Sequence, residues 1–324
     1  MTSKGIRVLP MRVALLVVVT CLVVYYFVSK PKSEPKGYVD LHRLLVAGIG
    51  AAEMGGNEVR RVREGNTLGE KSKGETLEGV NDPLTMGDTA SHRVMYHSLK
   101  AAFPMVNVVS EETDVKDSEL LIRLPPLANE EVGKMGLGSE VVNASDVTMW
   151  IDPLDATKEY TEKLLQYVTT MVCVAVDGKP VIGIIHKPFE RKTYWSWVGH
   201  GTNIDDKSND DITKIIVSLS HKGDVEDVAK RAFGDVSVIG AGGAGYKSLA
   251  LFDGTASVYV HTTRIKKWDI CAGNAIVRNA GGHMTTLTGS EIDYSSHGSP
   301  INDKGLVAAV RKHQHYLTKL NFGH

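Results

Sequence analysis

Three groups of acidic residues are spaced as expected for an oxygen-rich cation site. Each group lies at the predicted end of a strand or start of a helix: Glu111 with Glu112, Asp152 with Asp155, and Asp269. A carboxylate at a strand end faces a cleft, whereas one buried inside a strand carries a high desolvation cost. Neighbouring carboxylates repel one another unless a cation lies between them. Ligand sets made only of oxygen favour Mg²⁺, Mn²⁺ or Ca²⁺ over zinc, so the sequence predicts a divalent-cation site.

Each acidic group also has a simpler structural interpretation. Paired glutamates are common on surfaces, and Asp-Pro-x-Asp forms a tight turn, which we expect at 152–155. In the simpler interpretation Asp269 is no more than a helix cap, and so is Asp88 before the helix predicted from Thr89. The order along the chain, an acidic pair, then D-P-x-D-x-T, then W-D, favours one shared site over three unrelated features.

A glycine-rich loop, Gly240 to Gly245, follows a predicted strand and precedes a predicted helix. The pattern G-x-G-x-x-G is typical of dinucleotide-binding folds, where an acidic residue ends the next strand. Residues 262–264 are Thr-Thr-Arg instead, which argues against that function. We expect the loop amides to hold a phosphate at the helix start and Lys247 to neutralise it. The alternative for Lys247 is a solvated position on the helix.

The elements that must position these residues alternate along the chain. Helices are predicted at 38–64, 89–103, 224–233, 246–253 and 269–280. Strands are predicted at 106–110, 148–151, 168–176, 180–186, 194–198, 214–219, 236–239, 257–260 and 305–310. Exposed or long loops are expected at 65–79 and 125–147, and an Asp-Gly hairpin joins two of the strands. This alternation predicts a layered α/β or α+β architecture.

Composition restricts the class of protein. The chain has 324 residues, 42% hydrophobic, with 37 basic and 38 acidic side chains, which is typical of a globular protein. The balanced charge argues against a general binder of nucleic-acid polymers and leaves a local basic pocket open. Cys21, Cys173 and Cys271 all lie in hydrophobic segments, and their spacing predicts neither a disulfide framework nor a zinc site.

An uncharged run at residues 13–29 predicts a membrane segment. Its 17 residues are near the lower limit for a spanning helix. Tyr25 to Phe27 lie at one end, as in an aromatic belt, and do not resemble the small residues of a signal-peptide cleavage site. A buried core helix would need a polar face. We therefore predict a tail at 1–12, an anchor at 13–29, a linker at 30–37 and a soluble domain at 38–324.

Four segments together are specific to a family. Glu111-Glu112, Asp152-Pro153-Leu154-Asp155-Ala156-Thr157 and Trp268-Asp269 resemble the lithium-sensitive, metal-dependent sugar and nucleotide phosphatases related to inositol monophosphatase. Asp82 to Asp88 matches the D-x-x-T-x-x-D segment of that family. Ala156 departs from the usual glycine of D-G-T. The resemblance spans about 38–320 and is greatest to the branch that acts on nucleotide bisphosphates in the Golgi.

The resemblance implies an αβαβα sandwich, with an N-terminal α+β part to about residue 170 and a C-terminal α/β part after it. It implies hydrolysis of the 3′-phosphate of adenosine 3′,5′-bisphosphate to AMP and phosphate, which clears a by-product of sulfation. An inositol or sugar phosphate is the alternative substrate. The flanking charges are equal on both sides of the anchor and do not set its orientation. The resemblance alone implies a type II Golgi membrane protein with a lumenal domain. Asn143, in Asn-Ala-Ser, would then be available for glycosylation, and a homodimer is compatible with the resemblance.

The resemblance also implies a role for each site residue. A first Mg²⁺ ion is held by Glu111, Asp152 and the Leu154 carbonyl, and a second by Asp152, Asp155 and Asp269. A third, weaker ion lies near Glu111, and Glu112 orients water.

Proton transfer and substrate binding are assigned in the same way. Asp88 orients the Thr157 hydroxyl, and the two accept the proton of the attacking water. Ser218, His221, Gly243 and Lys247 contact the nucleotide.

Overall fold

The structure, a computed structural model, describes residues 37–75, 79, 81–113, 122–208, 214–219 and 225–320. The predicted tail, the anchor at 13–29 and all but the last residue of the linker lie outside these ranges, as does His221. Among the helices of the described ranges, none combines the length and apolar character needed to cross a membrane.

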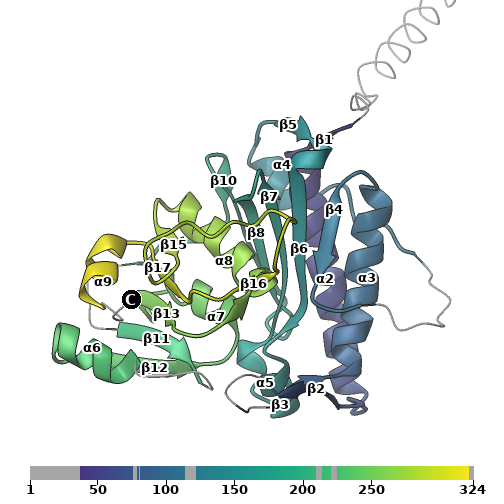
Figure 1. Ribbon diagram of the computed structural model, residues 1–324. Helices are drawn as coiled ribbons and strands as arrows, with labels where there is room; N and C mark the ends of the chain where they lie inside the picture. The colour runs from purple at the N-terminus through teal and green to yellow at the C-terminus, as the bar shows by residue number, and fades with distance from the viewer. Residues whose placement is uncertain are drawn as a thin grey trace, which may run out of the picture. The chain divides into compact units, whose positions relative to one another are not determined.

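The first half of the domain is built on a six-stranded sheet (Figure 1). Its order is β10-β9-β8-β7-β6-β4, where β4 is Asn107–Ser110, β6 Val147–Asp155, β7 Thr169–Val176, β8 Lys179–Lys187, β9 Lys192–Trp197 and β10 Gly201–Thr202. Helices α2 (Leu41–Glu64) and α3 (Met86–Ala102) cover one face of this sheet, and α8 (Lys267–Asn279) covers the other. A continuous apolar core fills the space beneath α2 and α3.

The second half is a five-stranded sheet of order β12-β11-β13-β17-β15. Its strands are β11 (Lys214–Ser218), β12 (Ser237–Ala241), β13 (Val258–His261), β15 (His283–Thr285) and β17 (Leu306–Ala309). Helix α7 (Ala244–Leu249) and α8 lie between the two sheets, while α6 (Val225–Phe233) and α9 (His313–Lys319) pack on the outer face. The predicted layered αβαβα arrangement is therefore confirmed.

Short elements complete the domain. Three two-stranded sheets pair β1 (Tyr38–Asp40) with β5 (Val141–Asn143), β2 (Lys71–Glu75) with β3 (Asn81–Leu84), and β14 (Ile265–Lys266) with β16 (Ile301–Asn302). Short helical segments are α4 (Glu130–Lys134), α5 (Thr157–Thr161), η1 (Ala144–Asp146) and η2 (Leu165–Tyr167).

The local signals of the sequence explain several of these boundaries. Asp177 and Gly178 both adopt positive φ, at 48° and 73°, and join β7 to β8 as a two-residue hairpin turn. Thr85 caps α3 by accepting a hydrogen bond from the Gly87 amide, while Asp88 accepts one from the Thr85 amide. This reciprocal pairing satisfies amides that the first helical turn leaves free.

Three expectations about local structure are wrong. The segment 65–79 was expected to be a loop, yet it contains β2, whose five residues are all exposed and so show no hydrophobic alternation. The segment 125–147 contains α4, β5 and η1. Asp152 and Asp155 do not flank a tight turn: both lie in β6, opposite Met171 and Thr169 of β7, so β6 carries one extra residue as a bulge.

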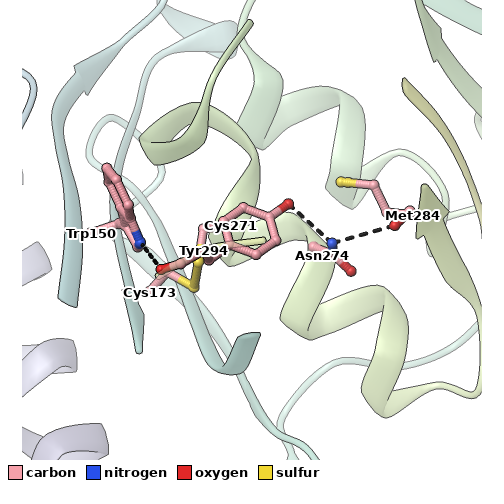
Figure 2. The surroundings of a disulfide bond; sticks show 6 residues. All are labelled: Trp150, Cys173, Cys271, Asn274, Met284 and Tyr294. Atoms are coloured by element: carbon pink, nitrogen blue, oxygen red, sulfur yellow. Dashed lines mark hydrogen bonds between the residues drawn. A yellow bond between two sulfur atoms is a disulfide. The ribbon is translucent and has the colours of Figure 1, made fainter. Parts of the chain in front are cut away.

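The expectation that the cysteines form no disulfide is also wrong. Cys173 of β7 and Cys271 of α8 are joined by a disulfide, with Cα atoms 5.7 Å apart and a sequence separation of 98 (Figure 2). Both side chains are buried. A separation of this size leaves no local sequence signal, because only the packing of α8 on the six-stranded sheet brings the two residues together.

Candidate functional site

A pocket of about 440 Å³ contains most of the predicted site residues. It is lined by Glu111, Asp152, Leu154, Asp155, Thr157, Ser218, Gly243, Lys247 and Asp269, together with Lys158, Glu159, Tyr259, Arg264 and Lys266. These residues come from the ends of strands in both sheets and from the first turns of α5, α7 and α8. Asp88 and Glu112 lie beside the pocket, while Asn143 is exposed at the end of β5 and does not line it.

Asp88 and Thr157 form a hydrogen-bonded pair. Thr157 Oγ1 lies 2.9 Å from Asp88 Oδ1 and 3.0 Å from the Leu154 carbonyl oxygen, to either of which it can donate. Thr85 donates its amide and hydroxyl to the other oxygen of Asp88, at 2.7 and 2.6 Å. Burial raises the pKa of Asp88 to about 6, although these two hydrogen bonds oppose the change. The pair can therefore accept a proton near neutral pH.

The glycine-rich loop holds Asp155. The amides of Ala244 and Gly245 donate to the Asp155 carboxylate, at 3.1 and 2.8 Å, and the Thr169 hydroxyl donates at 3.0 Å. A Cβ on Gly243, whose φ is +65°, would lie 2.9 Å from Asp155 Oδ2. Two of the amides expected to hold a phosphate therefore bind a carboxylate of this chain instead.

The remaining pocket carboxylates are close enough to disfavour one another's charge. Burial, and then the charges of Glu111 and Asp155, raise the pKa of Asp269 well above its ordinary value. The pKa of Asp152 is raised for the same reasons, with Asp269 also contributing. Burial raises the pKa of Glu111 to about 7. A divalent cation would relieve this repulsion, and an all-oxygen donor set suits Mg²⁺.

Lys73 supplies positive charge to this cluster, and no sequence pattern predicts that role. Its Nζ lies 2.9 Å from Glu111 and 2.5 Å from Glu112. Burial alone would lower the pKa of Lys73, but the two glutamates raise it above the ordinary value. Within the parts of the chain that the structure describes, no three acidic, histidine or cysteine side chains are already grouped as an ion site. The proposed ligands are all oxygen donors and line one pocket, so they fit a divalent cation.

Lys247 is buried, not solvated as its simpler interpretation required. Only 3% of it is exposed, and its Nζ donates to the Gly243 carbonyl at 2.6 Å. Burial lowers its pKa to about 8, although Asp155 and Glu159 favour the charged form. Glu159 and Arg264 also line the pocket and were not predicted. In the sequence analysis, Arg264 served only to argue against a dinucleotide-binding function.

Comparison with known proteins identifies relatives over most of the chain. The model of the inositol monophosphatase family matches residues 40–320. A Mus musculus protein named Golgi-resident adenosine 3′,5′-bisphosphate 3′-phosphatase is 48% identical, with 99% of this chain and 98% of that protein covered. A Danio rerio protein named inositol monophosphatase 3 is 47% identical, with 98% and 97% covered. Relatives of equal similarity thus carry two different names.

Solved structures share the fold at low sequence identity. The extragenic suppressor protein suhB from Bartonella henselae has a TM-score of 0.62 and 19% identity, over 85% of this chain and 96% of that one. CysQ from Bacteroides thetaiotaomicron has a TM-score of 0.59 and 22% identity, over 83% and 98%. At these identities the likeness establishes the fold alone.

Proposed function

The chain belongs to the inositol monophosphatase family, and we propose that it hydrolyses the 3′-phosphate of adenosine 3′,5′-bisphosphate to give AMP and phosphate. One observation carries this proposal: a single pocket contains both an acidic cluster suited to divalent cations and four basic side chains, Lys158, Lys247, Arg264 and Lys266. A bisphosphate has two anionic groups, and only one of them can lie at the acidic cluster. The name of the Mus musculus relative supports the same substrate.

The acidic cluster is assigned to Mg²⁺. Glu111, Asp152 and the Leu154 carbonyl would hold one ion, and Asp152, Asp155 and Asp269 a second. A third, weaker ion is assigned to Glu111. Such ions neutralise the anionic phosphoryl group, against which a nucleophile must otherwise approach.

The proton is handled by residues of the chain. The Thr157 hydroxyl accepts a proton from the attacking water and passes its own to Asp88 Oδ1, which lies 2.9 Å away. A pKa of about 6 keeps Asp88 ionised and basic at neutral pH. Glu112, fixed by Lys73, is assigned to orient the water.

The second phosphate is assigned to the basic part of the pocket. Arg264 is exposed there and has no acidic partner among the described residues. Ser218 and Gly243 line the same pocket, which supports assigning both of them to the nucleotide. His221 keeps this assignment on the sequence resemblance alone.

An inositol monophosphate is the second candidate, favoured by the name of the Danio rerio relative. A monophosphate leaves Arg264 without a partner on the substrate. Arg264→Ala should therefore lower kcat/KM for adenosine 3′,5′-bisphosphate by about 10- to 100-fold, the scale of one charge-assisted hydrogen bond. The loss on 3′-AMP should be much smaller. Arg231→Ala on α6 is the control, and equal losses on both substrates would contradict the assignment.

We further propose that residues 13–29 anchor the protein in the Golgi membrane as a type II protein with a lumenal domain. The disulfide supports this, because disulfides persist in oxidising compartments and are rare in the cytosol. Asn143 is exposed and therefore accessible for glycosylation. Protease added to intact microsomes should leave the domain undigested until detergent is present. Digestion without detergent would contradict the topology.

A further inference from the structure

Asp269 is the one proposed metal ligand that comes from α8. Asp152 and Asp155 lie together on β6, where the bulge sets their relative positions. Asp269 instead lies in the first turn of α8, where its carboxylate accepts a 3.0 Å hydrogen bond from the Lys266 amide. That hydrogen bond fixes the side chain to its own helix but not to β6. The distance between Asp269 and the β6 carboxylates therefore depends on how the start of α8 is held against the sheet.

The disulfide holds the helix at this point. Cys271 follows Asp269 by two residues, and Cys173 lies in β7 directly opposite Trp150 of β6. Asp152 is two residues beyond Trp150 on the same strand. A covalent path of a few residues thus connects the turn that carries Asp269 to β7, and β7 is hydrogen-bonded to the strand that carries Asp152.

Further contacts around the disulfide hold α8 against the six-stranded sheet. Trp150 donates its indole N–H to the Tyr294 carbonyl at 2.8 Å, and Tyr294 accepts a hydrogen bond from Asn274 of α8 (Figure 2). Beside Cys173, Gly183 of β8 lets α8 approach so closely that a Cβ there would lie 2.2 Å from the Ala272 carbonyl oxygen. These contacts lie at or beyond the disulfide along α8, on the side away from Asp269. Nearer to Asp269, the ring centroids of Trp268 and Trp150 lie 6.3 Å apart, which is a noncovalent contact. The disulfide is therefore the covalent attachment nearest to the ligand.

We propose that the Cys173–Cys271 disulfide is a positioning element of the metal site, which keeps the Asp269 carboxylate within reach of the ion that Asp155 also binds. The inference rests on the proposed function only for the role of Asp269 as a ligand. Like charges repel when no cation lies between them, so the carboxylates themselves favour separation of α8 from β6. The disulfide opposes that separation before an ion binds, and so lowers the cost of assembling the site.

The test is Mg²⁺ binding without substrate, measured by calorimetry on the full chain in detergent. In the Cys173→Ser/Cys271→Ser variant we expect one binding step to weaken by about tenfold or more, the scale for residues that support metal ligands. It should be the same step that Asp269→Asn removes, while the other step stays unchanged. Cys21→Ser controls for loss of a cysteine. Leu44→Ala, in the core beneath α2, controls for general destabilisation and should leave both steps unchanged.

The outcomes separate this inference from the proposed function. If Asp269→Asn leaves every binding step unchanged, the ligand assignment fails. If Asp269→Asn removes a step and the double cysteine variant binds as the wild type does, the disulfide has no positioning role. Circular dichroism establishes that each variant is folded. If the serine pair does not fold, Cys173→Val/Cys271→Ala fills the buried space with apolar side chains and is judged by the same criterion.

Discussion

The Gly245 amide donates a 2.8 Å hydrogen bond to the Asp155 carboxylate. The glycine-rich loop, which by its sequence resembles a dinucleotide-binding motif, thus uses its amides to orient an acidic side chain of the same chain. The start of α7 places partial positive charge near that carboxylate. The main role of the loop is therefore to orient a carboxylate of the acidic cluster, and contact with the substrate is a secondary role.

Gly243→Ala should displace Asp155. A Cβ there would lie 2.7 Å from the Tyr167 carbonyl oxygen and 2.9 Å from Asp155 Oδ2, at a backbone φ of +65°. We expect kcat/KM to fall by about 100-fold, as is usual for a misplacement of about 1 Å at a catalytic site. Gly234→Ala is the matched control, since Gly234 has a φ of +78° and open space around its Cα. It should lose stability and keep its activity. Equal activity of the two variants would contradict the role given to the loop.

The pKa of Asp88 predicts an acid limit to activity. Because the basic form is required, kcat/KM should rise with pH and level off above about 6. Asp88→Asn should lower the activity strongly, and its residual kcat/KM should no longer rise with pH in this range. If the pH profile of the variant still shows the same rise, a group other than Asp88 causes it.

Asp88 should also make stability depend on pH in the opposite sense. Its pKa is raised from 3.8 to about 6 in the folded state, so the folded protein binds this proton more tightly than the unfolded chain. The contribution of Asp88 to the free energy of unfolding therefore falls by about 3 kcal/mol as pH rises from about 4 to about 6. Urea unfolding of wild type and Asp88→Asn across this range measures the difference, and a flat difference would contradict it.

Lys73→Met should strengthen Mg²⁺ binding. The Lys73 ammonium forms ion pairs with Glu111 and Glu112, so it repels any cation that binds the same carboxylates. Mg²⁺ titrations should show tighter binding by about tenfold, which corresponds to about 1.4 kcal/mol. Lys71→Met, on the same exposed strand, should have no such effect. Unchanged or weaker binding in Lys73→Met would show that the ammonium does not compete with the ion.

Loss of the disulfide should destabilise the domain. Closing a loop of about 100 residues is worth about 4–5 kcal/mol in the chain-entropy model. Denaturant unfolding of Cys173→Ser/Cys271→Ser should show a loss of that order, while Cys21→Ser shows none. Denatured wild-type protein without reductant should present one reactive thiol, that of Cys21. Three reactive thiols would contradict the disulfide.

The sequence predicts the parts of this molecule that have local signals. The hydrophobic period of α2, the Asp-Gly turn at Asp177 and the strand-end position of Asp155 all come from short-range patterns, and the structure bears them out. Nine of the predicted site residues, several of them assigned through the family resemblance, line one pocket.

Features that depend on distant contacts could not be predicted. Lys73 lies on a strand without hydrophobic alternation, and it meets Glu111 only because β2 folds back towards β4. Cys173 and Cys271 meet only because α8 packs across the sheet. The burial of Lys247 follows from the layers around α7, whereas its position in sequence suggests an exposed helix residue.

The central claim is the substrate, and phosphate release by the full chain tests it most directly. Purified protein with Mg²⁺ is given adenosine 3′,5′-bisphosphate, 3′-AMP, 5′-AMP and inositol 1-phosphate in turn. We predict kcat/KM for the bisphosphate about 10- to 100-fold above that for inositol 1-phosphate, since a second charge-assisted contact is worth about 1.5–3 kcal/mol. The product should be 5′-AMP, and chelation of Mg²⁺ should abolish its formation. Preferred hydrolysis of inositol 1-phosphate, or release of the 5′-phosphate, would contradict the account.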